Sequence, residues 1–251
     1  MPFTIDLSDK VALVVGGGRG IGREIALALA DAGADVVVAA RTLSQVEETR
    51  DLILKKGRRS LAFPVDVAQK YQVVAMVEDT VKLLGGVHIL VNSAGITRPA
   101  PLLEYREEDW DAVMATNVKG MFLCTQAVGK YMVNQKYGKI INIASTGGEM
   151  AGPKNAVYHA SKGAAILFTK SVALEWIRYN INVNAIGPGF VDTDLLEDFD
   201  HKVKQQRLKV IPIRRIALAE EIGPLAVFLA SDYANYMVGE HVIIDGGLIS
   251  T

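Results

Sequence analysis

Three polar side chains in the middle of the sequence have the types and spacing of a proton-transfer site. Tyr158 and Lys162 are four residues apart, so in a helix they share one face, with about 6 Å of rise between them. A phenol has a reference pKa of about 10, and a nearby ammonium group lowers that pKa by favouring the phenolate. Ser145 ends an apolar run and could hydrogen-bond a substrate oxygen. Together they predict acid–base chemistry on an alcohol or a ketone, although Tyr-x-x-x-Lys alone is more often a half-exposed helix face.

A glycine-rich turn near the N-terminus is the second chemical signal. The apolar run 11–15 predicts a buried strand, and residues 23–30 have the composition of a helix. Between them lie Gly16, Gly20 and Gly22. Glycines let a pyrophosphate approach the backbone without a Cβ in the way, and the helix offers it free N–H groups. An ordinary glycine-rich turn is the alternative, but the flanking strand and helix favour a dinucleotide site.

The elements that must position these residues alternate between strands and helices. Strands are expected at residues 11–15, 35–40, 60–64, 88–91, 139–144, 181–186 and 241–245. Helices are expected at residues 23–30, 43–56, 69–84, 107–135, 156–178 and 220–229. This alternation predicts an α/β fold: a Rossmann-like, doubly wound, mostly seven-stranded parallel sheet with helices on both faces. No linker divides the chain, so residues 1–251 are expected to form a single domain with its ligands beyond the carboxyl ends of the strands.

Composition and charge exclude several classes of function. A formal net charge of −1 argues against a nucleic-acid partner, and no apolar run is long enough to cross a membrane. The single cysteine, Cys124, excludes an internal disulfide and reads as a packed core thiol. The histidines lack metal-ligand spacing, so no metal is expected. His159 directly follows Tyr158, so its side chain is expected to point to another side of the helix. With no signal peptide at the start, we expect a cytoplasmic protein.

The residues after the second strand bear on the choice of cofactor. An NAD-binding unit commonly places a carboxylate about 20 residues after the glycine turn, where it binds the ribose 2′-hydroxyl. This chain has Ala40 and Arg41 there. Arg41, with Arg19 in the turn, could bind a 2′-phosphate through paired donors, which favours NADP, with NAD as the alternative. Arg41 could also be an ordinary surface residue.

The glycine spacing G-x-x-x-G-x-G, Ser145 and the Tyr158–Lys162 pair together resemble the short-chain dehydrogenase/reductase family, over nearly the whole chain. Two positions depart from the family: Val15 stands where most members have Thr, and Ser93 where many have Asn. The resemblance implies a catalytic set of Asn117, Ser145, Tyr158 and Lys162, in which Asn117 is linked through its backbone and a water molecule toward the lysine.

The resemblance also implies how the cofactor is held. An Asp contacts the adenine, an Asn-Ala-Gly-like segment lines the cofactor, the Lys holds the nicotinamide ribose, and a Pro-Gly segment and a Thr flank the nicotinamide. The residues expected to bind the cofactor are Gly16, Gly18, Arg19, Gly20, Ile21, Gly22, Arg41, Asp66, Val67, Asn92, Ala94, Gly95, Tyr158, Lys162, Pro188, Gly189 and Thr193.

The expected activity is hydride transfer between NADP(H) and a small-molecule secondary alcohol or ketone. Within the family, the sequence resembles the 3-oxoacyl-[acyl-carrier-protein] reductase subgroup. An NAD-dependent sugar or polyol dehydrogenase is the alternative, and a non-catalytic nucleotide sensor is a third reading. In family members the stretch at about 190–215 is a lid over the substrate, although a solvated amphipathic pair of helices also fits it. Family members pair their long helices between subunits, so we expect a homotetramer, or failing that a dimer. The sequence does not identify the substrate.

Overall fold

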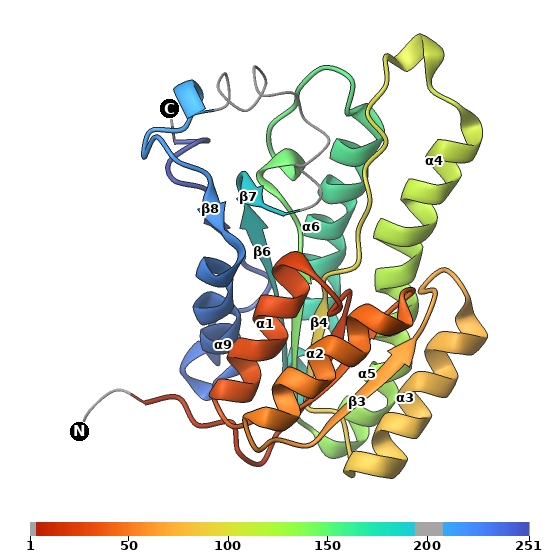
Figure 1. Ribbon diagram of the computed structural model, residues 1–251, viewed down its shortest axis with the longest axis vertical. Helices are drawn as coiled ribbons and strands as arrows, with labels where there is room; N and C mark the ends of the chain where they lie inside the picture. The colour runs from red at the N-terminus through yellow and green to blue at the C-terminus, as the bar shows by residue number, and fades with distance from the viewer. Residues whose placement is uncertain (1–3, 194–207, 251) are drawn as a thin grey trace.

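The computed structural model describes residues 4–193 and 208–250. Within them, seven parallel strands form one sheet in the order β3-β2-β1-β4-β5-β6-β9 (Figure 1). The strands are β1 (Val11–Val15), β2 (Asp35–Ala40), β3 (Ser60–Pro64), β4 (Ile89–Asn92), β5 (Gly138–Ile143), β6 (Ile181–Pro188) and β9 (His241–Ile244). The strand order reverses between β1 and β4, so the predicted doubly wound sheet is confirmed.

Both faces of the sheet are covered because its strands are apolar on both sides. Val14 and Val36 pack into one core with helices α1 (Gly20–Asp31), α2 (Leu43–Lys55) and α9 (Gly223–Ala230). Leu13 and Val37, one residue away from those valines, pack into a second core on the opposite face. That second core contains residues of α3 (Lys70–Leu84), α5 (Met121–Gln135) and α6 (Ala156–Trp176). Cys124 is fully buried in it, as expected of a core thiol.

The expected helix over 107–135 differs from the structure in its middle. Helix α4 (Glu107–Met114) and α5 are separated by a π-helical turn, Ala115–Gly120. Gly120 packs so closely on the loop after β3 that a Cβ there would lie 2.5 Å from Cγ2 of Val67. Asn117, inside the turn, bonds to the backbone of Ile96. These contacts accompany the wider turn, and π-turns of this kind are frequent at functional sites.

The predicted lid falls partly outside the described residues, because 194–207 are not among them. On either side of that segment, β7 (Val191–Asp192) pairs in parallel with β8 (Ala217–Leu218). This small two-stranded sheet was not predicted. It lies next to the carboxyl end of β6 (Figure 1).

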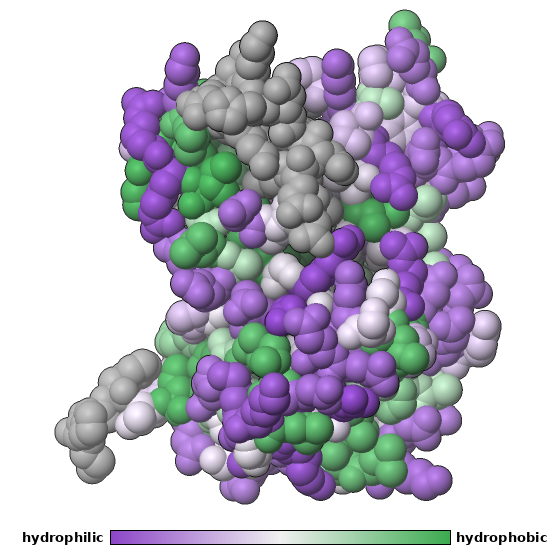
Figure 2. All heavy atoms as spheres, viewed as in Figure 1, coloured by the Kyte–Doolittle hydropathy of each residue, from purple (hydrophilic) through white to green (hydrophobic). Residues whose placement is uncertain are grey.

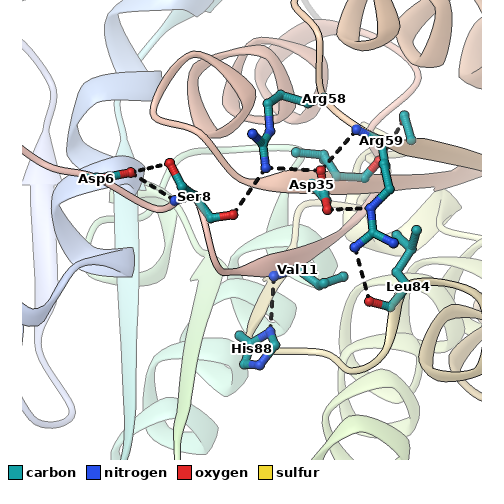
Figure 3. A network of polar contacts seen from close by, with 10 residues as sticks. Asp6, Ser8, Val11, Asp35, Arg58, Arg59, Leu84 and His88 are labelled. Atoms are coloured by element: carbon teal, nitrogen blue, oxygen red, sulfur yellow. Dashed lines mark hydrogen bonds and ion pairs between the residues drawn. The ribbon is translucent and has the colours of Figure 1, made fainter.

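At the amino-terminal ends of the strands, opposite the cavity end of the sheet, side chains form a network of hydrogen bonds and ion pairs (Figure 3). Asp35, 7% exposed, accepts hydrogen bonds from the backbone N–H and the Nε of Arg59, at 2.9 and 2.7 Å. Arg58 lies 3.1 Å from the same carboxylate and also donates to the carbonyl of Ser8. His88 accepts a hydrogen bond from the backbone of Val11. A buried carboxylate needs such partners, so this network is structural.

The face that carries α1, α2 and α9 mixes hydrophilic side chains with separate apolar patches (Figure 2). No helix among the described residues is both long and apolar enough to cross a membrane. In the same part of the chain, His, Cys, Asp and Glu side chains form no group of three that could hold a metal ion.

Candidate active site

A cavity of about 580 Å³ lies at the carboxyl ends of the strands. The glycine turn after β1 lines one end of it, and Ser145, Tyr158 and Lys162 line another part of its wall. Every residue predicted to bind the cofactor lines this cavity, apart from Asn92. Of the four predicted catalytic residues, only Asn117 is not on its wall. The fold therefore gathers segments that lie far apart in the sequence around one space.

The turn between β1 and α1 is built so that only glycine fits at two positions. Gly16 has φ +84°, and a Cβ there would lie 2.5 Å from the backbone nitrogen of Ala94. A Cβ on Gly22 would lie 2.1 Å from the carbonyl oxygen of Gly16. The N–H of Gly16 is tied to the carbonyl of Ala39 at 2.7 Å, and α1 begins at Gly20. This close backbone and free helix N-terminus fit a pyrophosphate group.

The part of the cavity wall that follows β2 agrees with the cofactor prediction in its charges. Ala40 and the exposed Arg41 line it, and no carboxylate follows β2 directly. Arg41 makes no hydrogen bond or ion pair with another described residue, so its guanidinium is available to a ligand in this part of the structure. Asp66, at the end of β3, accepts a hydrogen bond from the N–H of Ala68 and also lines the cavity.

The predicted catalytic side chains converge where β5 and α6 meet. Tyr158 and Lys162 lie one turn apart on α6, with the lysine Nζ 5.7 Å from the centre of the phenol ring. Lys162 is 7% exposed and donates to the carbonyl of Ile143, the last residue of β5, at 2.7 Å. Ser145 accepts from the N–H of Gly147 at 3.0 Å, which fixes its side chain at the start of the following loop.

The protonation of this group is controlled chiefly by burial. Burial raises the pKa of Tyr158 above its ordinary value, and a hydrogen bond with Ser145 offsets part of that shift. Burial lowers the pKa of Lys162 to about 8. The sequence-based expectation that the pKa of the tyrosine is lowered is therefore not met in this state, because withdrawal from water disfavours the phenolate more than the hydrogen bond with Ser145 favours it. The phenol keeps its proton, as a proton donor to a carbonyl oxygen must.

Asn117 lies behind the catalytic group rather than in the main cavity. It is 4% exposed, donates to the carbonyl of Ile96 and the hydroxyl of Ser161, and accepts from the N–H of Ile96. It therefore has the buried partners that an amide inside an apolar helix requires. It also lines a second cavity of about 10 Å³ together with Lys162 and Asn92. That volume is close to the room needed by one water molecule.

Asn92 was expected to bind the cofactor, but its side chain points elsewhere. It is the last residue of β4 and is 7% exposed. Its amide donates to Thr125 and Asn142, beneath the cavity, while its Oδ1 is buried without a partner. The residues after it, Ser93 to Gly95, are the ones that reach the cavity wall. The spacing placed the segment correctly, but the strand runs one residue further than expected and turns the amide inward.

His159 was not expected to face the site, and the structure corrects that expectation. Its ring lines the cavity beside Tyr158, with the two ring centres 6.0 Å apart. Both ring nitrogens bond to the loop that follows Ser145. Residue types could not predict these two contacts, because the partners of the ring are backbone atoms of Gly147 and Gly152.

The comparisons with known proteins agree with this geometry. The family model described as enoyl-(acyl carrier protein) reductase matches residues 15–249. A short-chain type dehydrogenase/reductase from Mycobacterium marinum has the same structure, with a TM-score of 0.95, 36% identity and 98% of each chain covered. This chain belongs to the short-chain dehydrogenase/reductase family. It is therefore an NAD(P)-dependent oxidoreductase, as the motifs predicted.

Two further relatives of this chain have names that give a substrate or a bound cofactor. The 3-oxoacyl-[acyl-carrier-protein] reductase of Staphylococcus epidermidis is 40% identical over 241 residues, which are 96% of this chain and 99% of the relative. A gluconate 5-dehydrogenase from Burkholderia cenocepacia, solved with NADP and tartrate, is 36% identical over 98% of both chains, with a TM-score of 0.94. NADP, the predicted cofactor, is thus bound by a solved relative with a closely similar fold.

Proposed function

We propose that this chain reduces a ketone to a secondary alcohol with NADPH, at the end of the cavity formed by Ser145, Tyr158 and Lys162. The observation that carries the proposal is their arrangement: a protonated phenol, a hydroxyl and a buried amine share one cavity with a glycine turn shaped for a pyrophosphate. A nucleotide sensor has no need of this proton-transfer group, so a catalytic role is favoured over sensing.

In the proposed reaction the chain's own residues handle the proton. The carbonyl oxygen of the substrate accepts a hydrogen bond from the hydroxyl of Ser145 and receives the phenolic proton of Tyr158. Lys162, when protonated, stabilises the phenolate left behind, since an opposite charge nearby favours it. Asn117 joins the backbone of Ile96 to Ser161, the residue before the lysine. The small cavity lined by Asn117 and Lys162 has room for the water link implied by the resemblance. The bound reduced nicotinamide supplies the hydride.

For the substrate we propose a 3-oxoacyl thioester, with sugar acids of the gluconate kind as the second candidate. The first is supported by 40% identity to 3-oxoacyl-[acyl-carrier-protein] reductases over nearly the full chain. The second is supported by solved relatives, and by polar side chains on the cavity wall, where Thr97 and Asn155 bond to each other at 3.2 Å. Measuring kcat/KM for acetoacetyl-coenzyme A and for 5-ketogluconate with NADPH decides between them. Preference for the ketogluconate would overturn the first choice.

Replacement of Arg41 by alanine tests the cofactor proposal. Charge-assisted hydrogen bonds contribute about 1.5–3 kcal/mol each, so Arg41→Ala should raise KM for NADPH by about tenfold or more and leave KM for NADH nearly unchanged. Arg106→Ala, an exposed arginine outside the cavity, is the matched control. A wild type that prefers NADH, or an Arg41→Ala variant with unchanged KM for NADPH, contradicts the proposed role.

We further propose a homotetramer in which α6 packs against its copy in a second subunit. Leu167 and Leu174 are two turns apart on α6, so they share a face, and they are 66% and 75% exposed. Phe122 of α5 and Ile177 are also exposed. Large apolar side chains gathered in this way are typical of interfaces between subunits. Light scattering should therefore give four times the chain mass, and the double variant L167D/L174D should give a smaller species. A monomeric wild type would refute the assembly.

A further inference from the structure

The loop from Thr146 to Asn155 contributes to the wall of the cavity, and one imidazole makes two hydrogen bonds to its backbone. Nδ1 of His159 lies 2.7 Å from the carbonyl oxygen of Gly147. Nε2 of the same ring accepts the N–H of Gly152 at 3.2 Å. The ring therefore bridges the beginning of the loop and a point five residues further along. No other described side chain bonds to both.

These two contacts define the form of the ring. A carbonyl oxygen can only accept, so Nδ1 must carry a hydrogen; an N–H can only donate, so Nε2 must be bare. The neutral imidazole with its proton on Nδ1 is the one form that makes both bonds. A Cβ on Gly147 would lie 2.8 Å from Nδ1, so the close approach of the ring requires glycine there.

The loop carries groups that the proposed reaction needs. Ser145 directly precedes it and bonds to the N–H of Gly147, the residue that His159 holds. Met150, Gly152 and Asn155 line the same cavity as Tyr158. A separate contact joins the loop to the sheet: Glu149 bonds to Nδ1 of His241 on β9 at 2.6 Å. His159 thus holds the part of the loop from Gly147 to Gly152, and Thr97 bonds to Asn155 at the end of the loop.

We propose that His159 is a positioning residue: its neutral ring clamps the loop 146–155 in the conformation that forms the substrate wall and orients Ser145. This inference rests on the proposed reductase activity for its kinetic part. The clamp itself concerns only the chain's own contacts and can be measured without any substrate.

Three substitutions separate the two hydrogen bonds. His159→Asn places an amide nitrogen near the position of Nδ1, so it keeps the donor to Gly147 and loses the acceptor for Gly152. His159→Gln places an amide oxygen near the position of Nε2, with the opposite result. His159→Phe loses both bonds and keeps an aromatic ring beside Tyr158.

Hydrogen exchange of the Gly152 amide in the protein without ligands gives the direct readout. Exchange should be about tenfold faster in His159→Phe and His159→Asn than in wild type, and close to wild type in His159→Gln. Equal exchange in wild type and all three variants would overturn the clamp. Because no substrate is used, this result stands apart from the proposed activity.

Steady-state kinetics then tests what the clamp does. With both bonds lost, His159→Phe should raise KM for the ketone about tenfold, with KM for NADPH within about twofold of wild type. His159→Gln should recover part of that loss. An unchanged KM for the ketone in His159→Phe, or an equal loss in NADPH binding, contradicts the positioning role. Failure of wild type to reduce any ketone would instead contradict the proposed function, and leaves the exchange result to decide the clamp.

Discussion

Replacing Tyr158 by phenylalanine is expected to lower kcat by about 10²–10⁴-fold, the usual contribution of a positioned acid or base. The change removes only the hydroxyl, which is the proton donor in the proposed reaction, and keeps the ring next to His159. Binding of NADPH should remain, because the glycine turn and Arg41 are untouched. The cost to stability should be small, about 0.5–1.5 kcal/mol, since the hydroxyl makes one side-chain hydrogen bond, with Ser145.

The Tyr158→Phe experiment combines turnover with a binding titration. NADPH affinity, measured by its fluorescence, shows that the variant is folded and loaded with cofactor. Tyr179→Phe, a tyrosine near the far end of α6, is the matched control and should keep the wild-type rate. Wild-type turnover in Tyr158→Phe would rule out this tyrosine as the proton donor.

Replacing Lys162 by methionine is expected to have the second large effect, a loss of about 10²-fold or more in kcat together with weaker binding of NADPH. Methionine keeps most of the volume and removes the charge. The loss should be functional rather than structural, because a buried amine contributes little to stability: it must be desolvated to be buried. Removing the buried amine should raise the unfolding free energy, and losing its hydrogen bond to the Ile143 carbonyl should offset part of that increase. The unfolding free energy of Lys162→Met should therefore fall by no more than about 1 kcal/mol.

The pH dependence of stability checks the electrostatic part of this prediction. The pKa of Lys162 is about 8 in the folded protein against an ordinary value of 10.5, so the unfolded chain binds more protons between these values. The destabilising contribution is fully present below about pH 8 and is relieved as the pH rises toward 10.5. The stability of Lys162→Met relative to wild type should thus be highest below pH 8 and decline above it. A difference independent of pH would contradict the lowered pKa.

The sheet, and most of the site, could be predicted because their signals are local in sequence. Gly16, Gly20 and Gly22 lie within seven residues of each other, and Tyr158 and Lys162 are one helical turn apart. In a parallel sheet, residues that follow strands come together at one edge, so knowing the strands was enough to expect Ser145 and Pro188 at the same edge of the sheet, where both line the cavity.

The features that were missed depend on contacts between distant segments. The π-turn at Asn117 accompanies the packing of Gly120 on Val67, about fifty residues earlier in the chain. The inward turn of Asn92 depends on Thr125 and Asn142. His159 recognises backbone atoms, which every residue has, so its own neighbours in sequence gave no signal. The raised pKa of Tyr158 follows from burial, which helical spacing does not report.

The parts of the cavity wall expected to contact the substrate lie largely in irregular segments of the chain. The loop 146–155 and residues 97–98 have no regular pattern, and part of the predicted lid lies outside the described residues. Helical or strand periodicity therefore says nothing about the wall that the substrate contacts.

Transfer of deuterium from NADPH that carries deuterium at both positions of nicotinamide C4 tests the proposed reaction most directly. Wild-type protein, labelled NADPH and acetoacetyl-coenzyme A are incubated together, and the hydroxyacyl product is examined by mass spectrometry. The expected product carries one deuterium on the carbon that bears the new hydroxyl, and Tyr158→Phe forms it about 10²–10⁴-fold more slowly. A product without deuterium, or equal rates for wild type and Tyr158→Phe, would contradict hydride transfer assisted by Tyr158.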